Sequence, residues 1–119
     1  MNKEFFEALS VLGENVDKVI LIKRIKSAIF RVVKKNYPNA KKIIVNIDEK
    51  KEVFEMGIVK TVMMDSRLKD PDNEIYFEDA KKISSKALLG EKIFVPLNHS
   101  DFRRTTVDIL REALSRKSA

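Results

Sequence analysis

Apolar positions along the chain follow a helical period at first, then a strand period, and then a helical period again. They recur at three- and four-residue spacing over residues 2–12 and again over 17–36, which predicts two amphipathic helices. Asp17 can cap the first free N–H groups of the second helix, and Pro38 prevents its continuation. The apolar stripe predicted to be buried on the second helix is Ile22, Ile25, Ile29, Val32 and Val33.

Alternating apolar and polar positions mark the middle of the chain. They run over residues 42–47 and about 52–64, which predicts two strands joined as a hairpin. Gly57 inside the second strand predicts a bulge or bend. A third strand is expected over 91–97, and it lies at an edge or ends at Pro96, because proline cannot donate a ladder hydrogen bond.

Two more helices complete the expected elements. A short one spans 77–83, after a polar loop over 65–74, and a long one opens at Asn98. The fold class is therefore predicted as α+β, with about four helices (two N-terminal, one short, one long C-terminal) around a small, mainly antiparallel three-stranded sheet. Because no repeat or linker interrupts the chain, residues 1–119 are expected to form a single domain.

Composition limits the class of protein. Of 119 residues, 44% are hydrophobic and 35% are charged, and no apolar run approaches the roughly 18 residues of a membrane span. The absence of cysteine excludes disulfides and thiolate metal sites and agrees with a cytoplasmic location. The net charge of +6, from 24 basic and 18 acidic residues, attracts nucleic acid, anionic lipid or acidic protein.

Few residues offer catalytic chemistry. His99 is the single histidine, and no nucleophile accompanies it in a pattern that would activate one. The acidic loop 65–74 lacks the glycine of a calcium-binding loop, so it is predicted to be a solvated turn. Met63 and Met64 are predicted to fill gaps in the core. The sequence therefore predicts a binding module without metal or cofactor, and not an enzyme.

Basic residues supply the candidate contacts. Arg104 and Arg111 are seven residues apart, so they project from one face of the last helix. Such a pair can hold phosphates or carboxylates. Asp108 and Glu112 lie within one turn and can pair with it, however, so that spacing alone favours a solvated face. The candidate partner- or RNA-binding residues are Arg104, Arg111, Arg103, Arg116, Lys23 and Lys26.

Four stretches of the chain resemble one protein family. They are MNKEFFEAL at residues 1–9, KKNYPNAKKIIVNID at 34–48, DPDNEIYFEDAKKI at 70–83 and LGEKIFVPLNHSDFRR at 89–104. In this order and spacing they resemble the amino-terminal domain of the bacterial transcription factor NusA. In the family's last helix a phenylalanine, an arginine and a lysine occupy positions that correspond here to Phe102, Arg104 and Arg111.

The resemblance implies a transcription module that is not an enzyme. Its expected partner is RNA polymerase, contacted at the β-flap near the RNA exit channel and also at the α subunit. The nascent RNA hairpin and other Nus factors are further expected partners. The expected effect is on pausing, termination and antitermination. NusA proteins continue into S1 and KH domains, which this chain does not contain, and the sequence leaves open whether it is part of a longer protein. The alternative function is a free-standing basic RNA- or ribosome-associated binding domain.

Overall fold

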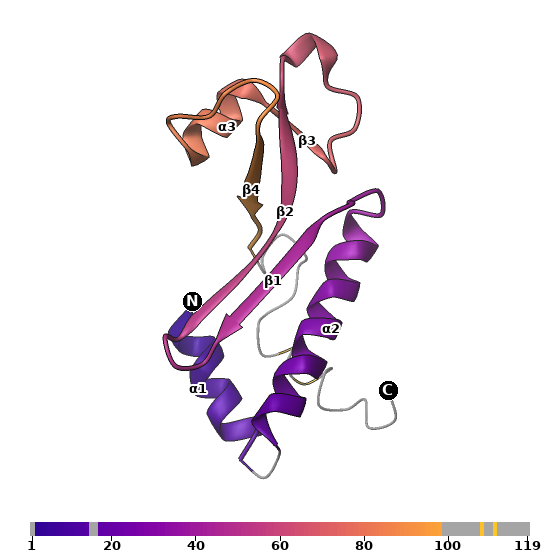
Figure 1. Cartoon of the computed structure of the whole chain (residues 1–119). Helices are drawn as coiled ribbons and strands as arrows, with labels where there is room; N and C mark the ends of the chain where they lie inside the picture. The colour runs from indigo at the N-terminus through magenta and orange to yellow at the C-terminus, as the bar shows by residue number, and fades with distance from the viewer. Residues whose placement is uncertain (1, 15–16, 99–107, 109–110, 112–119) are drawn as a thin grey trace.

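One long strand, β2 (Val53–Met63), is the central element of the fold (Figure 1). The antiparallel strands β1 (Ile43–Asp48) and β4 (Lys92–Pro96) lie on opposite edges of β2, because both pair with Gly57 and Ile58 of that strand. The short strand β3 (Glu74–Tyr76) pairs with β2 in parallel and follows β1 along the same edge. The computed structural model describes residues 2–14, 17–98, 108 and 111.

Three of the four predicted helices lie within the described residues and are present there. The first two are α1 (Asn2–Leu12) and α2 (Lys18–Asn36), and both lie beside the β1–β2 hairpin (Figure 1). Asp17 caps α2, since its carboxylate accepts the N–H of Val19 at 2.9 Å. The third, α3 (Phe77–Ile83), follows directly after β3 at the other end of β2.

Two apolar cores of unequal size divide the described residues into two lobes. The large lobe comprises α1, α2, β1 and the first half of β2, and the small lobe comprises the second half of β2, η1 (Asp65–Arg67), β3, α3 and β4. Among the described residues, the large core contains thirteen buried residues and the small one contains three. The small core is formed by Val62, Ala80 and Ala87, with Ile75, Phe77 and Ile93 packed against it.

The two lobes meet where β1 and β3 lie end to end. Here the side chain of Asn73 binds the segment that connects α2 to β1. Its Nδ2 donates to the carbonyl of Asn39 at 2.6 Å, and its Oδ1 accepts the N–H of Lys41 at 2.8 Å. Asp72 accepts the N–H of Asn39 at 3.0 Å. Lys60 from β2 donates to the carbonyl of Pro71 at 2.8 Å. We call this set of contacts the junction, and it fixes the small lobe to the large one.

The predicted number of strands and the bulge, one of the two alternatives predicted at Gly57, are wrong. Among the described residues the sheet has four strands and is mixed, because β3 pairs with β2 in parallel. The sequence did not predict β3, which is only three residues long. Gly57 marks no bulge, since the register of β2 with both neighbours is continuous. A Cβ at Gly57 would instead collide with the carbonyl oxygen of Val95 and would lie 2.7 Å from the ring of Phe94. Glycine is therefore required for close approach of β4.

The expected fourth helix lies almost wholly outside the described residues. Of its span, the structure describes Asn98, which is exposed and not helical, and Asp108 and Arg111, which are both helical and exposed.

Candidate functional site

The basic excess of the protein is concentrated on α2. This helix carries seven of the 24 Lys and Arg residues and none of the 18 Asp and Glu residues. The remainder of the chain therefore has 17 basic and 18 acidic residues and is close to neutral. Charge of one sign on a single face creates a local field that attracts anions.

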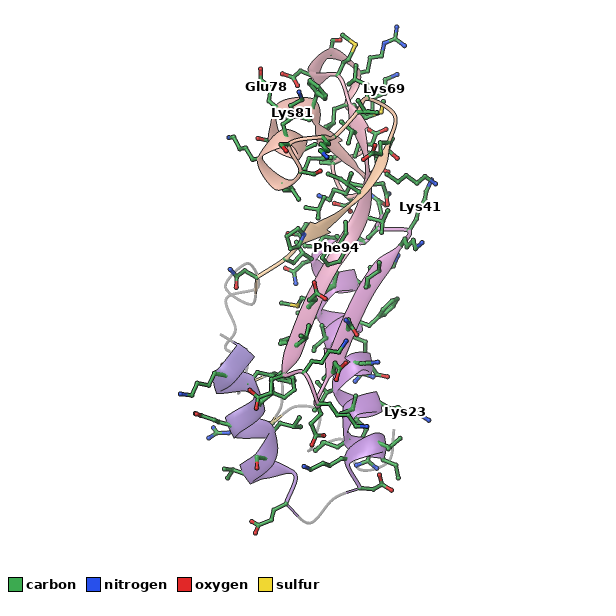
Figure 2. The ribbon with its side chains drawn as sticks, turned by 60° about the vertical axis from the view of Figure 1, so that its left-hand side comes forward. Lys23, Lys41, Lys69, Glu78, Lys81 and Phe94 are labelled. Carbon is green, nitrogen blue, oxygen red and sulfur yellow. The ribbon has the colours of Figure 1, made fainter. Side chains whose placement is uncertain are left out.

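The two faces of α2 differ sharply. One is apolar and faces the large core, with Leu21, Ile25, Ala28, Ile29, Val32 and Val33 buried. The opposite face is exposed and includes Lys23, which points away from the sheet (Figure 2). Next to it, α2 and β1 enclose an open cavity of about 450 Å³. The cavity is lined by Lys26, Ser27, Phe30, Arg31, Ile43 and Val45.

Few of the α2 cations are neutralised by the rest of the described chain. Lys18 forms an ion pair with Glu49 at 2.8 Å, and Lys34 donates to the carbonyl of Ala40 at 2.9 Å. Within residues 2–14, 17–98, 108 and 111, no other cation of α2 is paired with a carboxylate. The face is thus available to an anionic partner.

The small lobe carries a second, apolar surface. Met64 and Leu89 are each 52% exposed, and together with Phe77 they line a cavity of about 390 Å³ whose rim is completed by Asp65, Ser66 and Glu78. The predicted burial of Met64 is therefore wrong, whereas Met63 is half-buried. We call this surface the small-lobe cavity. An apolar hollow with a polar rim is typical of a protein-contact site.

The acidic loop is used inside the structure. Glu74 accepts the N–H groups of Lys69 and Asp70, both at 2.9 Å, and these hydrogen bonds, Lys69 first, lower the pKa of its carboxyl. Burial lowers the pKa of Lys60, while Asp72 and Asp70 partly oppose that change. The described residues contain no group of three or more His, Cys, Asp or Glu that could hold a metal ion. Instead of being a merely solvated turn, the loop forms the junction.

The candidate residues from the sequence are only partly described. Lys23 and Lys26 lie on the same helix, the first exposed and the second half-buried beside the cavity, and Arg111 is exposed. The contact residues Arg103, Arg104 and Arg116 lie outside the described residues, as do Phe102 and His99.

Sequence reasoning missed Phe30 and Arg31 as members of the cavity. The absence of any acidic residue from α2 was a readable signal for the basic face, but the cavity depends on where β1 lies.

These observations define a small α+β contact module with a basic helix face at one lobe and an apolar cavity at the other. Residues 4–118 match the NusA N-terminal domain family, and the chain belongs to that family. The family predicted from the four sequence stretches is thereby confirmed. None of the described helices is sufficiently long and apolar to cross a membrane.

Two relatives illustrate the similarity. The transcription termination/antitermination protein NusA of Bacillus subtilis (strain 168) is 24% identical over 122 residues, which cover 98% of this chain and 32% of that protein. The chain thus spans about a third of the length of this curated relative. The solution structure of the N-terminal domain of NusA from B. subtilis superposes with a TM-score of 0.58 at 22% identity, covering 98% of this chain and 94% of that one. This similarity confirms the α+β fold.

Proposed function

We propose that this chain is a transcription module that docks on RNA polymerase near the β-flap and the RNA exit channel and modulates pausing and termination. The observation that carries the proposal is its membership of the NusA N-terminal domain family over residues 4–118. The α subunit of the polymerase and other Nus factors are further proposed partners. The module works by contact and contributes no catalytic group.

The small-lobe cavity is the proposed protein-docking surface. Its apolar lining from Met64, Phe77 and Leu89 can receive an apolar side chain of the polymerase, and burial of such a surface drives association. The polar rim from Asp65 and Glu78 can fix the orientation of the partner. This cavity lies on the lobe opposite to α2, so a protein contact here leaves the basic face open.

The basic residues are proposed to face the emerging RNA hairpin. The pair predicted from the sequence is Arg104 and Arg111, flanked by Arg103 and Arg116. Lys23 and Lys26 of α2 are candidate RNA contacts of the alternative function. Arginine and lysine at these positions can neutralise phosphates without reading sequence. The alternative function, a free-standing RNA- or ribosome-associated domain, is favoured by the concentration of charge on α2, because that feature needs no polymerase.

Retention of RNA polymerase core, and of the isolated β-flap, on the 119-residue chain tests the docking. Wild type is expected to retain both. Leu89→Glu should reduce retention at least about tenfold, because it places a charge in the small-lobe cavity. The matched control is Val11→Glu, which adds the same charge at a residue of α1 that is 72% exposed and should leave retention unchanged. Equal retention by both variants contradicts the docking surface.

A pausing assay separates docking from the action on RNA. Arg104→Ala combined with Arg111→Ala is expected to leave retention of the polymerase intact and to shorten hairpin-stabilised pauses. If the double variant prolongs such pauses as well as wild type does, the assignment of the arginine pair is wrong.

A further inference from the structure

The exposed face of α2 carries an ordered stripe of side chains. Ile20, Lys23, Ser27, Phe30 and Lys34 are all exposed, and their spacing of three and four residues places them in one row along the helix. The row lies opposite the buried residues of the same helix. Lys26 and Arg31 flank it on its two sides and line the cavity with Phe30.

Phe30 is the most exposed of the six phenylalanines that the structure describes. It is 46% exposed, on a helix whose other exposed positions are mostly cationic. Its ring borders the open cavity between α2 and β1, and Ile43 and Val45 from β1 form the apolar floor. A flat aromatic ring with cations on both sides offers a stacking surface for a base and charges for the adjoining phosphates.

The ligand of this face must be strongly anionic. The helix carries seven cations and no acid, and of these only Lys18 is paired with a carboxylate of the described chain. The distance from Lys18 to Lys35 along the helix is about 25 Å. A strand with one charge at every nucleotide can neutralise cations along this whole length and brings a planar base with each charge, whereas an acidic peptide can cover Phe30 only where it also carries an aromatic side chain.

A single strand fits better than a duplex. In a helical stem the bases are stacked on one another, so their faces are closed to a protein ring. An exposed aromatic side chain therefore gains nothing from a duplex, while cations bind the phosphates of either form. Phe30 is the feature that separates the two ligands.

We propose that the α2 face binds single-stranded RNA, with a base stacked on Phe30 and phosphates held by Lys26 and Arg31. This activity needs no polymerase. It specifies the ligand of the alternative function and is separate from docking through the small-lobe cavity. Phosphate contact combined with stacking gives affinity with little sequence preference.

Fluorescence anisotropy with the full chain and a labelled eight-nucleotide oligouridine tests the proposal, with a fully paired RNA stem of equal charge as the comparison. Phe30→Ala is expected to weaken binding of the single strand about tenfold and to leave binding of the stem unchanged. Phe30→Leu should behave like Phe30→Ala, and Phe30→Tyr should restore the affinity. Ile20→Ala, at a 48% exposed apolar residue of the same row, is the matched control and should have little effect.

Charge is tested by salt. In a plot of log affinity against log salt concentration, Lys26→Gln combined with Arg31→Gln should give a less steep slope than wild type. The reduction should correspond to the loss of about one to two phosphate contacts. Equal single-strand affinity of Phe30→Ala and wild type overturns the proposal. So does binding of oligoglutamate, or of vesicles rich in anionic lipid, with the same loss on Phe30→Ala. The two proposals can fail independently. Phe30→Ala should still retain RNA polymerase core, since Phe30 is not part of the small-lobe cavity. If wild type fails to retain core, the docking function is contradicted and the RNA-binding result still stands.

Discussion

The large and small lobes share β2 but are stabilised in different ways. In the large lobe thirteen buried residues form one core, and Phe5, Ile25 and Ile29 are fully enclosed in it. The small core has three buried residues, of which two are alanines. The small lobe therefore depends on strand pairing with β2 and on the hydrogen bonds of the junction. A lobe with so little apolar burial is expected to open more readily than the rest of the molecule.

The surfaces of the two lobes differ as well. The large lobe exposes the cations of α2, whereas the small lobe exposes apolar side chains around the small-lobe cavity. A larger core in the small lobe would have buried these apolar side chains. Because the core is small, they remain exposed and can contact a partner. The proposed protein contact and the proposed anion contact thus lie on different lobes, and we expect that each can be removed without the other.

The largest loss of stability is expected from a substitution in the large core. Ile29→Ala should lower the free energy of unfolding by about 3 kcal/mol, because a fully buried isoleucine leaves a cavity when it is truncated. Val62→Ala in the small core should cost about 2 kcal/mol. Urea unfolding measures both changes. Amide exchange distinguishes them: Val62→Ala should accelerate exchange in β3 and α3 and leave α2 protected.

This prediction fails if the two variants accelerate exchange uniformly across both lobes. That result would mean that β2 transmits every change through the whole molecule, and the lobes would then be a single cooperative unit. A matched exposed change, Ser27→Ala on α2, should leave both measurements near the wild-type values.

The contact between β4 and β2 is the next test. Gly57→Ala should lower the free energy of unfolding by about 2 kcal/mol, because its new methyl group meets the backbone of Val95 and the ring of Phe94. Phe94 lies where the two lobes meet (Figure 2). The control, Gly90→Ala, has open space around the added Cβ but a φ of +82°, so its cost is backbone strain of about 1 kcal/mol. A Gly57→Ala variant as stable as wild type would contradict the importance of the close approach at Gly57.

The three described helices could be predicted from the sequence nearly to the residue. The bounds of α1 and α3 agree with the predicted ranges, and α2 begins directly after its predicted cap Asp17. These features depend on local causes: apolar spacing, a capping carboxylate and proline. The hairpin of β1 and β2 could be predicted for the same reason, since alternation and a polar turn are close together in the chain.

Features set by distant contacts could not be predicted. The three residues of β3 are too few to show a period, and they form a strand because β2 offers them an unoccupied stretch of its edge. Leu21 and Ala28 are buried on α2, although the predicted stripe omitted them. They are buried because the core contacts a wider face of the helix than the predicted stripe covers. On the candidate site, the charge of α2 was readable, whereas the exposure of Phe30 depends on the position of β1.

The smallest expected effect concerns the hydrogen bonds that tie the junction loop. The pKa of Glu74 is lowered from its ordinary value of 4.5, first by the N–H of Lys69 and then by that of Asp70. A carboxyl with a lower pKa in the folded state contributes stability that is fully present above pH 4.5 and is lost as the pH falls through its folded pKa. Wild type should therefore be more stable than Glu74→Gln at pH 7, and this difference should disappear in acid.

Urea midpoints measured from pH 7 down to about pH 2.5 test this expectation, because two-state midpoints at constant slope report the free energy of unfolding. The control is Glu91→Gln in the small lobe, whose side chain makes no hydrogen bond or ion pair with the described residues. Its midpoints should lie close to those of wild type. If Glu74→Gln runs parallel to wild type at every pH, the two N–H groups bind the neutral amide as well as the carboxylate. The junction would then be held by the geometry of the loop alone, and the attachment of the small lobe would be insensitive to acid at this residue.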